Sequence, residues 1–213
     1  MALPPVPLPA LERLQALLQR PGRQLLGIAG PPGTGKSSFA QALQQALSDS
    51  VVTQVVPMDG FHLANCELAR RGLTHCKGAP ETFDVAGFVA LLQRLRHAGP
   101  VETVMAPEFR RSIEEPVAGA IAVLPATRLV IVEGNYLLLP TGEWAGVDAL
   151  LDDTWYLDTE DILRQSRLIT RHREFGRTAT AARAWVEQTD EPNARLIATH
   201  RERARWTFRW EVP

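Results

Sequence analysis

The sequence predicts an α/β fold, in which helices cover both faces of a parallel β-sheet. Short apolar segments typical of buried strands alternate with segments in which apolar residues recur at helical spacing. Strands separated by helices imply a parallel sheet that is covered on both sides. The 213-residue chain is 45% hydrophobic and 22% charged, which is close to ordinary globular usage. No repeat, low-complexity tract or linker divides residues 1–213, so we expect a single domain.

The first half of the chain begins with a helix, a strand and a second helix. Leucines recur at helical spacing over residues 11–18, and the apolar segment Gln24–Ala29 is a strand that runs directly into a glycine-rich turn. A helix with one apolar stripe follows Lys36, and the β-branched residues 51–56 indicate a second buried strand. Residues 58–83 have no clean period, which predicts an ordered functional loop with one helical turn.

The second half continues the alternation and closes on a strand. Asp84 is the expected N-cap of a helix that ends at Gly99. Apolar Trp206, Phe208 and Trp210 alternate with polar residues, which predicts a closing strand. Between these two points we expect, in order, a strand at 101–106, a charged stretch at 107–116, strands at 128–133 and 154–157, and helices at about 159–175 and 179–205.

Charge and composition exclude several classes of protein. The 23 Lys and Arg residues against 24 Asp and Glu give a formal charge of −1, so binding to nucleic acid or membrane surfaces through net positive charge is not expected. No run of about 18 apolar residues could span a bilayer, and the N-terminus lacks the basic region of a signal peptide. Two cysteines are too few for a disulfide scaffold. These features predict a cytoplasmic domain and leave a homodimer open.

The segment Gly30-x4-Gly35-Lys36-Ser37 fits the P-loop pattern and stands between a strand and a helix, as that motif requires. Backbone N–H groups of such a loop wrap phosphate oxygens, and the helix N-terminus adds partial positive charge. Lys36 is expected to reach the β- and γ-phosphates, and Ser37 to ligate Mg²⁺. The sequence therefore predicts a site for ATP and Mg²⁺. Its expected nucleotide-binding residues are Gly30, Gly33, Thr34, Gly35, Lys36, Ser37 and Ser38.

Four segments in order carry a family likeness. They are residues 30–37, Pro57-Met58-Asp59-Gly60-Phe61-His62, Lys77-Gly78-Ala79-Pro80-Glu81-Thr82-Phe83-Asp84 and Glu133-Gly134-Asn135-Tyr136. Over about residues 24–205 the chain resembles the superfamily of uridine kinase, phosphoribulokinase and type I pantothenate kinase, and within it a short bacterial nucleoside/nucleotide kinase-like branch. The resemblance implies a P-loop kinase fold with lid helices at about 160–191 and a core at about 24–160 and 192–213.

Two carboxylates follow strands where ligands bind in open α/β sheets. By resemblance Asp59 is the general base that accepts the proton of the attacking hydroxyl, and its carboxylate also suits Mg²⁺; the alternative is a turn aspartate before Gly60. Glu133 ends the strand predicted at 128–133, where an acid of this class holds Mg²⁺ through water. The expected metal-binding residues are therefore Ser37, Asp59 and Glu133.

The resemblance also implies an acceptor loop and a lid. His62, Lys77, Glu81 and Asp84 are the expected substrate-binding residues of the loop. The alternative for Glu81 and Asp84 is an acidic turn with a helix N-cap, and for Asp84 the cap is favoured. The spacing of His62, Cys66, His75 and Cys76 does not resemble a zinc knuckle. Arg164, Arg167 and Arg171 share a helical face. The expected catalytic residues are Lys36, Asp59, Arg167 and Arg171, with a solvated, salt-bridged helix as the alternative for the arginines.

These features predict a kinase that moves the γ-phosphoryl group of ATP onto an alcohol of a small metabolite. A nucleoside, a sugar and a pantothenate-like alcohol all remain open as acceptors. Phe109 offers no hydroxyl where uridine kinases carry tyrosine, and Cys76 replaces a basic residue common in the short branch. The alternative from another class is a nucleotide-dependent switch that acts through a protein partner. The acidic residues expected to face the P-loop favour the kinase, and no guanine-specificity motif or transporter signature occurs.

Overall fold

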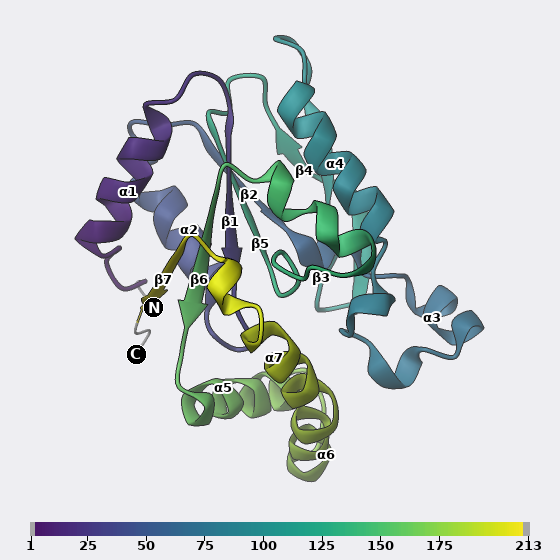
Figure 1. The fold of residues 1–213 in the computed structure, drawn as a ribbon. Helices are drawn as coiled ribbons and strands as arrows, with labels where there is room; N and C mark the ends of the chain where they lie inside the picture. Colours follow the sequence, from purple (N-terminus) through teal and green to yellow (C-terminus); the bar gives the residue numbers. More distant parts are fainter. Residues whose placement is uncertain (1–2, 211–213) are drawn as a thin grey trace.

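The computed structural model describes residues 3–210 and has a five-stranded parallel sheet at its centre (Figure 1). The strand order is β2-β5-β1-β6-β7, so the first strand lies in the middle. Strands β3 and β4 form a separate antiparallel hairpin. The strands are β1 Gln24–Ala29, β2 Thr53–Pro57, β3 Val104–Arg110, β4 Glu115–Val123, β5 Leu129–Gly134, β6 Asp153–Asp158 and β7 Trp206–Arg209. The parallel α/β sheet predicted from the sequence is confirmed.

Helices lie on both faces of this sheet and at its carboxyl edge. Helices α1 and α2 pack on one face, where Phe39 and Leu43 meet the buried side chains of β1 and β6. Helix α4 packs on the other face, where Phe88 and Leu92 join a second apolar cluster. The helices are α1 Leu8–Leu18, α2 Lys36–Ala46, α3 Asn65–Arg71, α4 Val85–His97, α5 Asp161–Glu174, α6 Ala179–Trp185 and α7 Glu191–Ala198.

The central strands β1 and β5 are buried at every residue. Apart from Gln24 at the start of β1 and Glu133 near the end of β5, these strands contain only apolar residues and glycine, which is the pattern that identified them in the sequence. All five strands run in the same direction, so the segments that leave them at their carboxyl ends meet along one edge. The loop after β1, the turn after β2, the end of β5 and the helix after β6 therefore gather at that edge.

Two predictions about the second half were wrong. The strand expected at 101–106 instead begins at Val104 and extends to Arg110, and β4, which was not expected, begins at Glu115 within the charged stretch 107–116. The helix expected at 179–205 is divided into α6, a π-helical segment Val186–Asp190 and α7. Pro192 closely follows this π-helical segment and lacks the N–H that an uninterrupted α-helix would use at that position.

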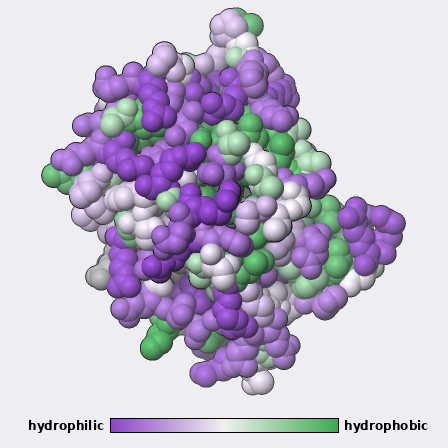
Figure 2. All heavy atoms as spheres, in the orientation of Figure 1, coloured by the Kyte–Doolittle hydropathy of each residue, from purple (hydrophilic) through white to green (hydrophobic). Residues whose placement is uncertain are grey.

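The surface in Figure 2 is covered mostly by hydrophilic residues, with hydrophobic ones in small separate groups. Within residues 3–210, none of the helices combines the length and apolar character needed to cross a membrane.

Candidate functional site

The P-loop connects β1 to α2 and has the backbone of a phosphate cradle. Gly33 and Gly35 have φ angles of 83° and 95°, which favour glycine over any residue with a Cβ. A Cβ on Gly33 would also lie 2.7 Å from the carbonyl oxygen of Arg164, so the loop packs closely against α5. The buried Thr34 hydroxyl donates to the carbonyl oxygen of Pro31 at 2.9 Å and holds the turn. The loop is therefore preformed.

Lys36 is folded back over this loop. Its ammonium group donates to the carbonyl oxygens of Gly30 and Pro31 at 2.8 and 2.9 Å, and the residue is only 7% exposed. Burial lowers the pKa of Lys36 to about 8, although the carboxylates of Glu133 and Asp59 oppose this shift. These partners are neutral carbonyl oxygens, which do not cancel the positive charge of a buried ammonium. An anion that replaced them would do so.

Ser37 and Glu133 join the P-loop to the end of β5. The Ser37 hydroxyl donates to Glu133 Oε1 at 2.8 Å, and Glu133 is 6% exposed. Burial, followed by the negative charge of Asp59, raises the pKa of Glu133. A hydroxyl and a carboxylate held together are hard oxygen ligands of the kind that Mg²⁺ takes in proteins. Two of the three residues named from the sequence as metal ligands, Ser37 and Glu133, are therefore neighbours.

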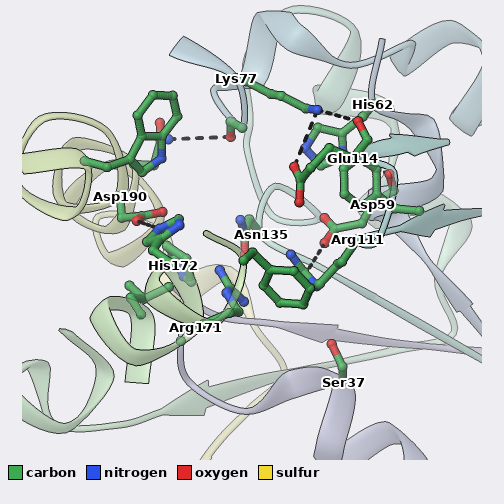
Figure 3. Close-up of a pocket in the computed structure, with 18 of the residues that line it drawn as sticks. Ser37, Asp59, His62, Lys77, Arg111, Glu114, Asn135, Arg171, His172 and Asp190 are labelled. Carbon is green, nitrogen blue, oxygen red and sulfur yellow. Dashed lines mark hydrogen bonds and ion pairs between the residues drawn. The ribbon is translucent and has the colours of Figure 1, made fainter. Parts of the chain in front are cut away.

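Asp59 lies in the 3₁₀ turn Met58–Phe61 that follows β2 (Figure 3). Its carboxylate forms an ion pair with Arg111, with Nη2 3.4 Å from Oδ2. Burial opposes ionisation of Asp59, but electrostatic interactions with the His62 ring and with the positive charges of Arg111 and Lys36 together outweigh it and lower its pKa. Gly60 leaves no room for a side chain because a Cβ there would strike the Pro107 carbonyl group. The hairpin thus presses directly on the turn that carries Asp59.

These groups line one cavity of about 760 Å³. Of the residues named from the sequence, it is lined by Gly33, Gly35, Lys36, Ser37, Ser38, Asp59, His62, Lys77, Glu133, Arg167 and Arg171. Gly30 and Thr34 belong to the same loop but are not part of the lining. Glu81 is exposed and Asp84 caps α4, accepting from the Gly87 N–H at 2.9 Å, and neither lines the cavity.

The wall of the cavity facing the P-loop is formed by residues of the 58–83 loop and the hairpin, and we call it the acceptor wall. The His62 ring lies between the rings of Phe83 and Phe109, with centroids 4.1 and 4.7 Å away. Lys77 donates to Asn65 Oδ1 at 2.8 Å and to the carbonyl oxygen of Glu114 at 2.7 Å. Burial lowers the pKa of His62, although the Asp59 carboxylate and a hydrogen bond to the Asp59 backbone oppose this shift.

The α5 arginines, expected to act together, divide into two groups. Arg167 and Arg171 line the cavity, and burial lowers the pKa of both. Arg164 does not line it. That side chain is 1% exposed and donates to Glu191 Oε1 at 2.7 Å, to Asp161 and to the Pro32 carbonyl oxygen. Arg164 therefore ties α5 to α7 and to the P-loop.

Two further contacts hold the segment after α5 in place, and the first of them joins it to α5 itself. His172 Nε2 lies 2.8 Å from Asp190 Oδ2, and the guanidinium of Arg177 lies 3.9 Å from the ring centre of Trp185. All four of these residues line the cavity. Asn193, at the start of α7, reaches the Gly78 carbonyl oxygen at 3.5 Å. The π-helical segment thus brings α5, α7 and the acceptor loop together.

Sequence reasoning missed several residues of the lining. Arg111 and Glu114 were not assigned a role because β4 was not predicted, so the turn that returns them to the cavity was not recognised. Glu114 has a φ angle of 53° and is the only non-glycine residue among 3–210 with a positive φ. Such a conformation costs about 1–2 kcal/mol. Asn135, quoted from the sequence as part of a motif, also lines the cavity.

The cysteines and histidines of the 58–83 loop do not gather. Cys66 is exposed and Cys76 is half-buried. Over residues 3–210 no group of three or more His, Cys, Asp or Glu side chains is arranged to hold a metal ion by itself.

The sheet is parallel, the P-loop follows its central strand, and acidic residues lie at the carboxyl ends of the neighbouring strands β2 and β5. Together with the arginines of α5, these features define a P-loop kinase. No protein-family model matches the chain. A proposed uridine kinase of Schizosaccharomyces pombe is 36% identical over 186 residues, covering 84% of this chain and 78% of that protein. The solved structure of a proposed fructose transport system kinase from Silicibacter sp. TM1040 has a TM-score of 0.86 and 40% identity, covering 95% of this chain and 99% of the other.

Pantothenate kinases are also similar, although this chain spans only about half of their length. That of Ligilactobacillus salivarius is 32% identical over 151 residues, covering 69% of this chain and 48% of the enzyme. The chain belongs to the superfamily of P-loop kinases that includes uridine kinase, phosphoribulokinase and pantothenate kinase. It is a phosphotransferase that uses a nucleoside triphosphate and a small molecule with an alcohol group.

Proposed function

We propose that this kinase transfers the γ-phosphoryl group of ATP to an alcohol of a small metabolite, with Asp59 as the general base. The acceptor oxygen forms a bond to the γ-phosphorus while the bond from that phosphorus to the β,γ-bridging oxygen breaks. ADP leaves with the electron pair, and the hydroxyl proton passes to the Asp59 carboxylate. The Asp59 carboxylate can accept this proton because the surrounding groups, which lower its pKa, hold it in the ionised form before the reaction.

Positive charge around the P-loop is the second part of the proposal. Lys36 would exchange the carbonyl oxygens of Gly30 and Pro31 for the β- and γ-phosphate oxygens. Arg167 and Arg171 approach the same space from α5 and would neutralise the charge that spreads over the transferred group. Catalysis in this site is therefore positioning and electrostatic stabilisation, with one proton transfer.

Ser37, Glu133 and Asp59 are the residues that would hold Mg²⁺. They fit this ion because the Ser37 hydroxyl and the Glu133 carboxylate already meet at 2.8 Å, and Asp59 lines the same cavity. When bound, Mg²⁺ neutralises phosphate charge and orients the terminal phosphate. Glu133, near the end of β5, contributes by accepting the hydrogen bond that orients the Ser37 hydroxyl.

We further propose that residues of about 160–191 act as a lid over a single core domain. Two features of α5 support this. Arg164 anchors its first turn to the P-loop and α7, while Arg167 and Arg171 extend over the cavity from later turns. The contacts of His172 with Asp190 and of Arg177 with Trp185 would let α5 and α6 move as one unit.

The observation that carries the proposal is the meeting of Lys36, Asp59, Glu133 and Arg171 in one cavity. No observation favours the alternative of a nucleotide-dependent switch. The test measures ADP release by the purified protein with ATP and Mg²⁺, with and without a panel of small alcohols. A kinase releases ADP only when an acceptor is present and forms a phosphorylated product. Release of ADP that no alcohol stimulates would contradict the proposal.

A further inference from the structure

The acceptor wall contains a carboxylate in an unusual backbone conformation. Glu114, in the turn between β3 and β4, has a φ of 53°. Its carbonyl oxygen accepts from Asn65 Nδ2 at 3.0 Å and from Lys77 Nζ at 2.7 Å, and these bonds hold the left-handed conformation. A strained residue that the surrounding structure holds in place is typical of ligand sites. The effect here is that the Glu114 side chain is directed to the cavity, where it is half-exposed.

Glu114 and Lys77 present complementary hydrogen-bonding groups side by side (Figure 3). Lys77 Nζ lies 3.6 Å from Glu114 Oε2, while Asn65 Oδ1 receives another of its N–H bonds at 2.8 Å. A carboxylate accepts from hydroxyl groups and an ammonium donates to them. Two hydroxyl groups on adjacent carbons could therefore each find a charged partner at this point.

The aromatic rings of the acceptor wall are covered by other side chains. His62 packs between Phe83 and Phe109, and the Lys77 ammonium lies 5.0 Å from the centre of the Phe109 ring. Across the cavity, Arg177 covers Trp185. A planar base needs an open ring face against which to stack. Phe175, at the end of α5, is the remaining aromatic ring in the described lining and is 49% exposed.

The charges of the cavity balance once a nucleotide is bound. Six basic and four acidic side chains line it among the described residues, which gives a formal balance of +2. A magnesium-bound triphosphate carries about two negative charges and matches this balance. The cations of the acceptor wall already have acidic partners, because Lys77 contacts Glu114 and Arg111 contacts Asp59. An anionic acceptor would compete with these carboxylates.

We propose that the phosphate acceptor is a small, uncharged polyhydroxy compound of the sugar or sugar-alcohol class, and that Glu114 and Lys77 bind two of its hydroxyl groups. This inference rests on the proposed kinase function and selects one of the three acceptor classes that the sequence left open. Glu114 and Lys77 orient the acceptor so that a further hydroxyl meets Asp59. Loss of the Glu114 carboxylate removes a charge-assisted hydrogen bond, which weakens acceptor binding by about 10- to 100-fold.

The first experiment compares acceptor classes at fixed ATP and Mg²⁺ by ADP release and detection of the phosphorylated product. The panel contains neutral hexoses, ketoses and alditols, the nucleosides uridine and adenosine, and the hydroxy acids glycerate and pantothenate. The expected result is turnover with one or more neutral polyols and none with the other two classes. A nucleoside or hydroxy acid as the best acceptor would overturn the acceptor class while leaving the kinase function intact.

A third outcome is possible in this experiment: the protein binds ATP, but no compound stimulates ADP release. That result would contradict the kinase function and this inference with it.

The second experiment uses Glu114→Gly, Glu114→Gln and Lys77→Met with the best polyol. Glycine adopts a φ of 53° without strain, so Glu114→Gly is expected to unfold at no lower temperature than the wild type. Weaker acceptor binding in this variant would therefore be caused by the missing carboxylate and not by unfolding of the protein.

All three variants should raise the KM for the acceptor by about 10- to 100-fold and leave the KM for ATP unchanged. Glu108→Gln is the matched control, because Glu108 lies on the same hairpin, is exposed and pairs only with Arg110 among the described residues. It should leave both KM values unchanged. An unchanged acceptor KM in Glu114→Gly, or an equal loss in Glu108→Gln, would show that Glu114 does not bind the acceptor.

Discussion

Replacement of Arg164 by methionine should destabilise the protein and leave its catalytic groups in place. The guanidinium is almost completely buried and donates to Glu191 at 2.7 Å, and Glu191 is itself 15% exposed. Removing one partner of a buried ion pair costs about 3–5 kcal/mol because the other charge stays buried. The bond to Asp161 adds little, since that carboxylate is 77% exposed and such pairs contribute about 0–1 kcal/mol. We expect a loss of about 3–4 kcal/mol in total.

Urea unfolding followed by circular dichroism measures this loss in the free energy of unfolding. For a chain of this size, the loss corresponds to a decrease in Tm on the order of 10 °C. Arg173→Met, at an exposed position on the same helix, is the control and should change the free energy of unfolding by less than about 0.5 kcal/mol. The double variant Arg164→Met/Glu191→Met should regain part of the loss because no charge remains unpaired. A loss below about 1 kcal/mol in Arg164→Met would refute the assignment of Arg164 as a structural link.

Three further predictions concern the catalytic groups. Asp59→Asn should lower acceptor-dependent turnover by about 10²–10⁴-fold while binding of a fluorescent ATP analogue is retained; unchanged turnover would exclude Asp59 as the base. The pKa of Lys36 lies near 8 in the free protein, so the ammonium is lost above that pH and kcat/KM for ATP should fall as the pH rises through about 8; a flat profile to pH 9 would contradict this. Arg111→Gln removes a cation that lowers the pKa of Asp59, so the acidic limb of the kcat/KM profile for the acceptor should move to higher pH, whereas Arg110→Gln, on the exposed neighbour, should leave it in place.

Local patterns in the sequence were enough to predict the centre of the fold. The β1 strand, the P-loop and α2 are contiguous, and each is determined by apolar spacing and glycine within about twenty residues. The Asp84 N-cap was predicted for the same reason, since the cap and the Gly87 N–H are three residues apart. Features of this kind depend on the chain near them and not on its tertiary contacts.

The features that sequence reasoning missed depend on tertiary contacts. Strand β4 contains the exposed, small residues Ala118, Gly119 and Ala120, which have low β-propensity, and it pairs only with β3. Without β4, neither Arg111 nor Glu114 could be placed beside Asp59. Helical spacing likewise put Arg164 on one face with Arg167 and Arg171, but it could not show that the first turn of that face packs on the P-loop. The spacing of residues along a helix predicts which side chains share a face, but not which parts of the protein that face contacts.

Asp59 and Glu133 are two carboxylates of one cavity whose environments move their pKa values in opposite directions. Asp59 is close to Arg111 and His62, which hold it ionised, while Glu133 is buried and its pKa is raised further by the charge of Asp59. When the environments of two carboxylates move their pKa values apart, the two groups can have different roles in one site. In the free protein a proton therefore binds to Glu133 in preference to Asp59. A cation bound beside Ser37 would favour the ionised form of Glu133 and so oppose the upward shift of its pKa.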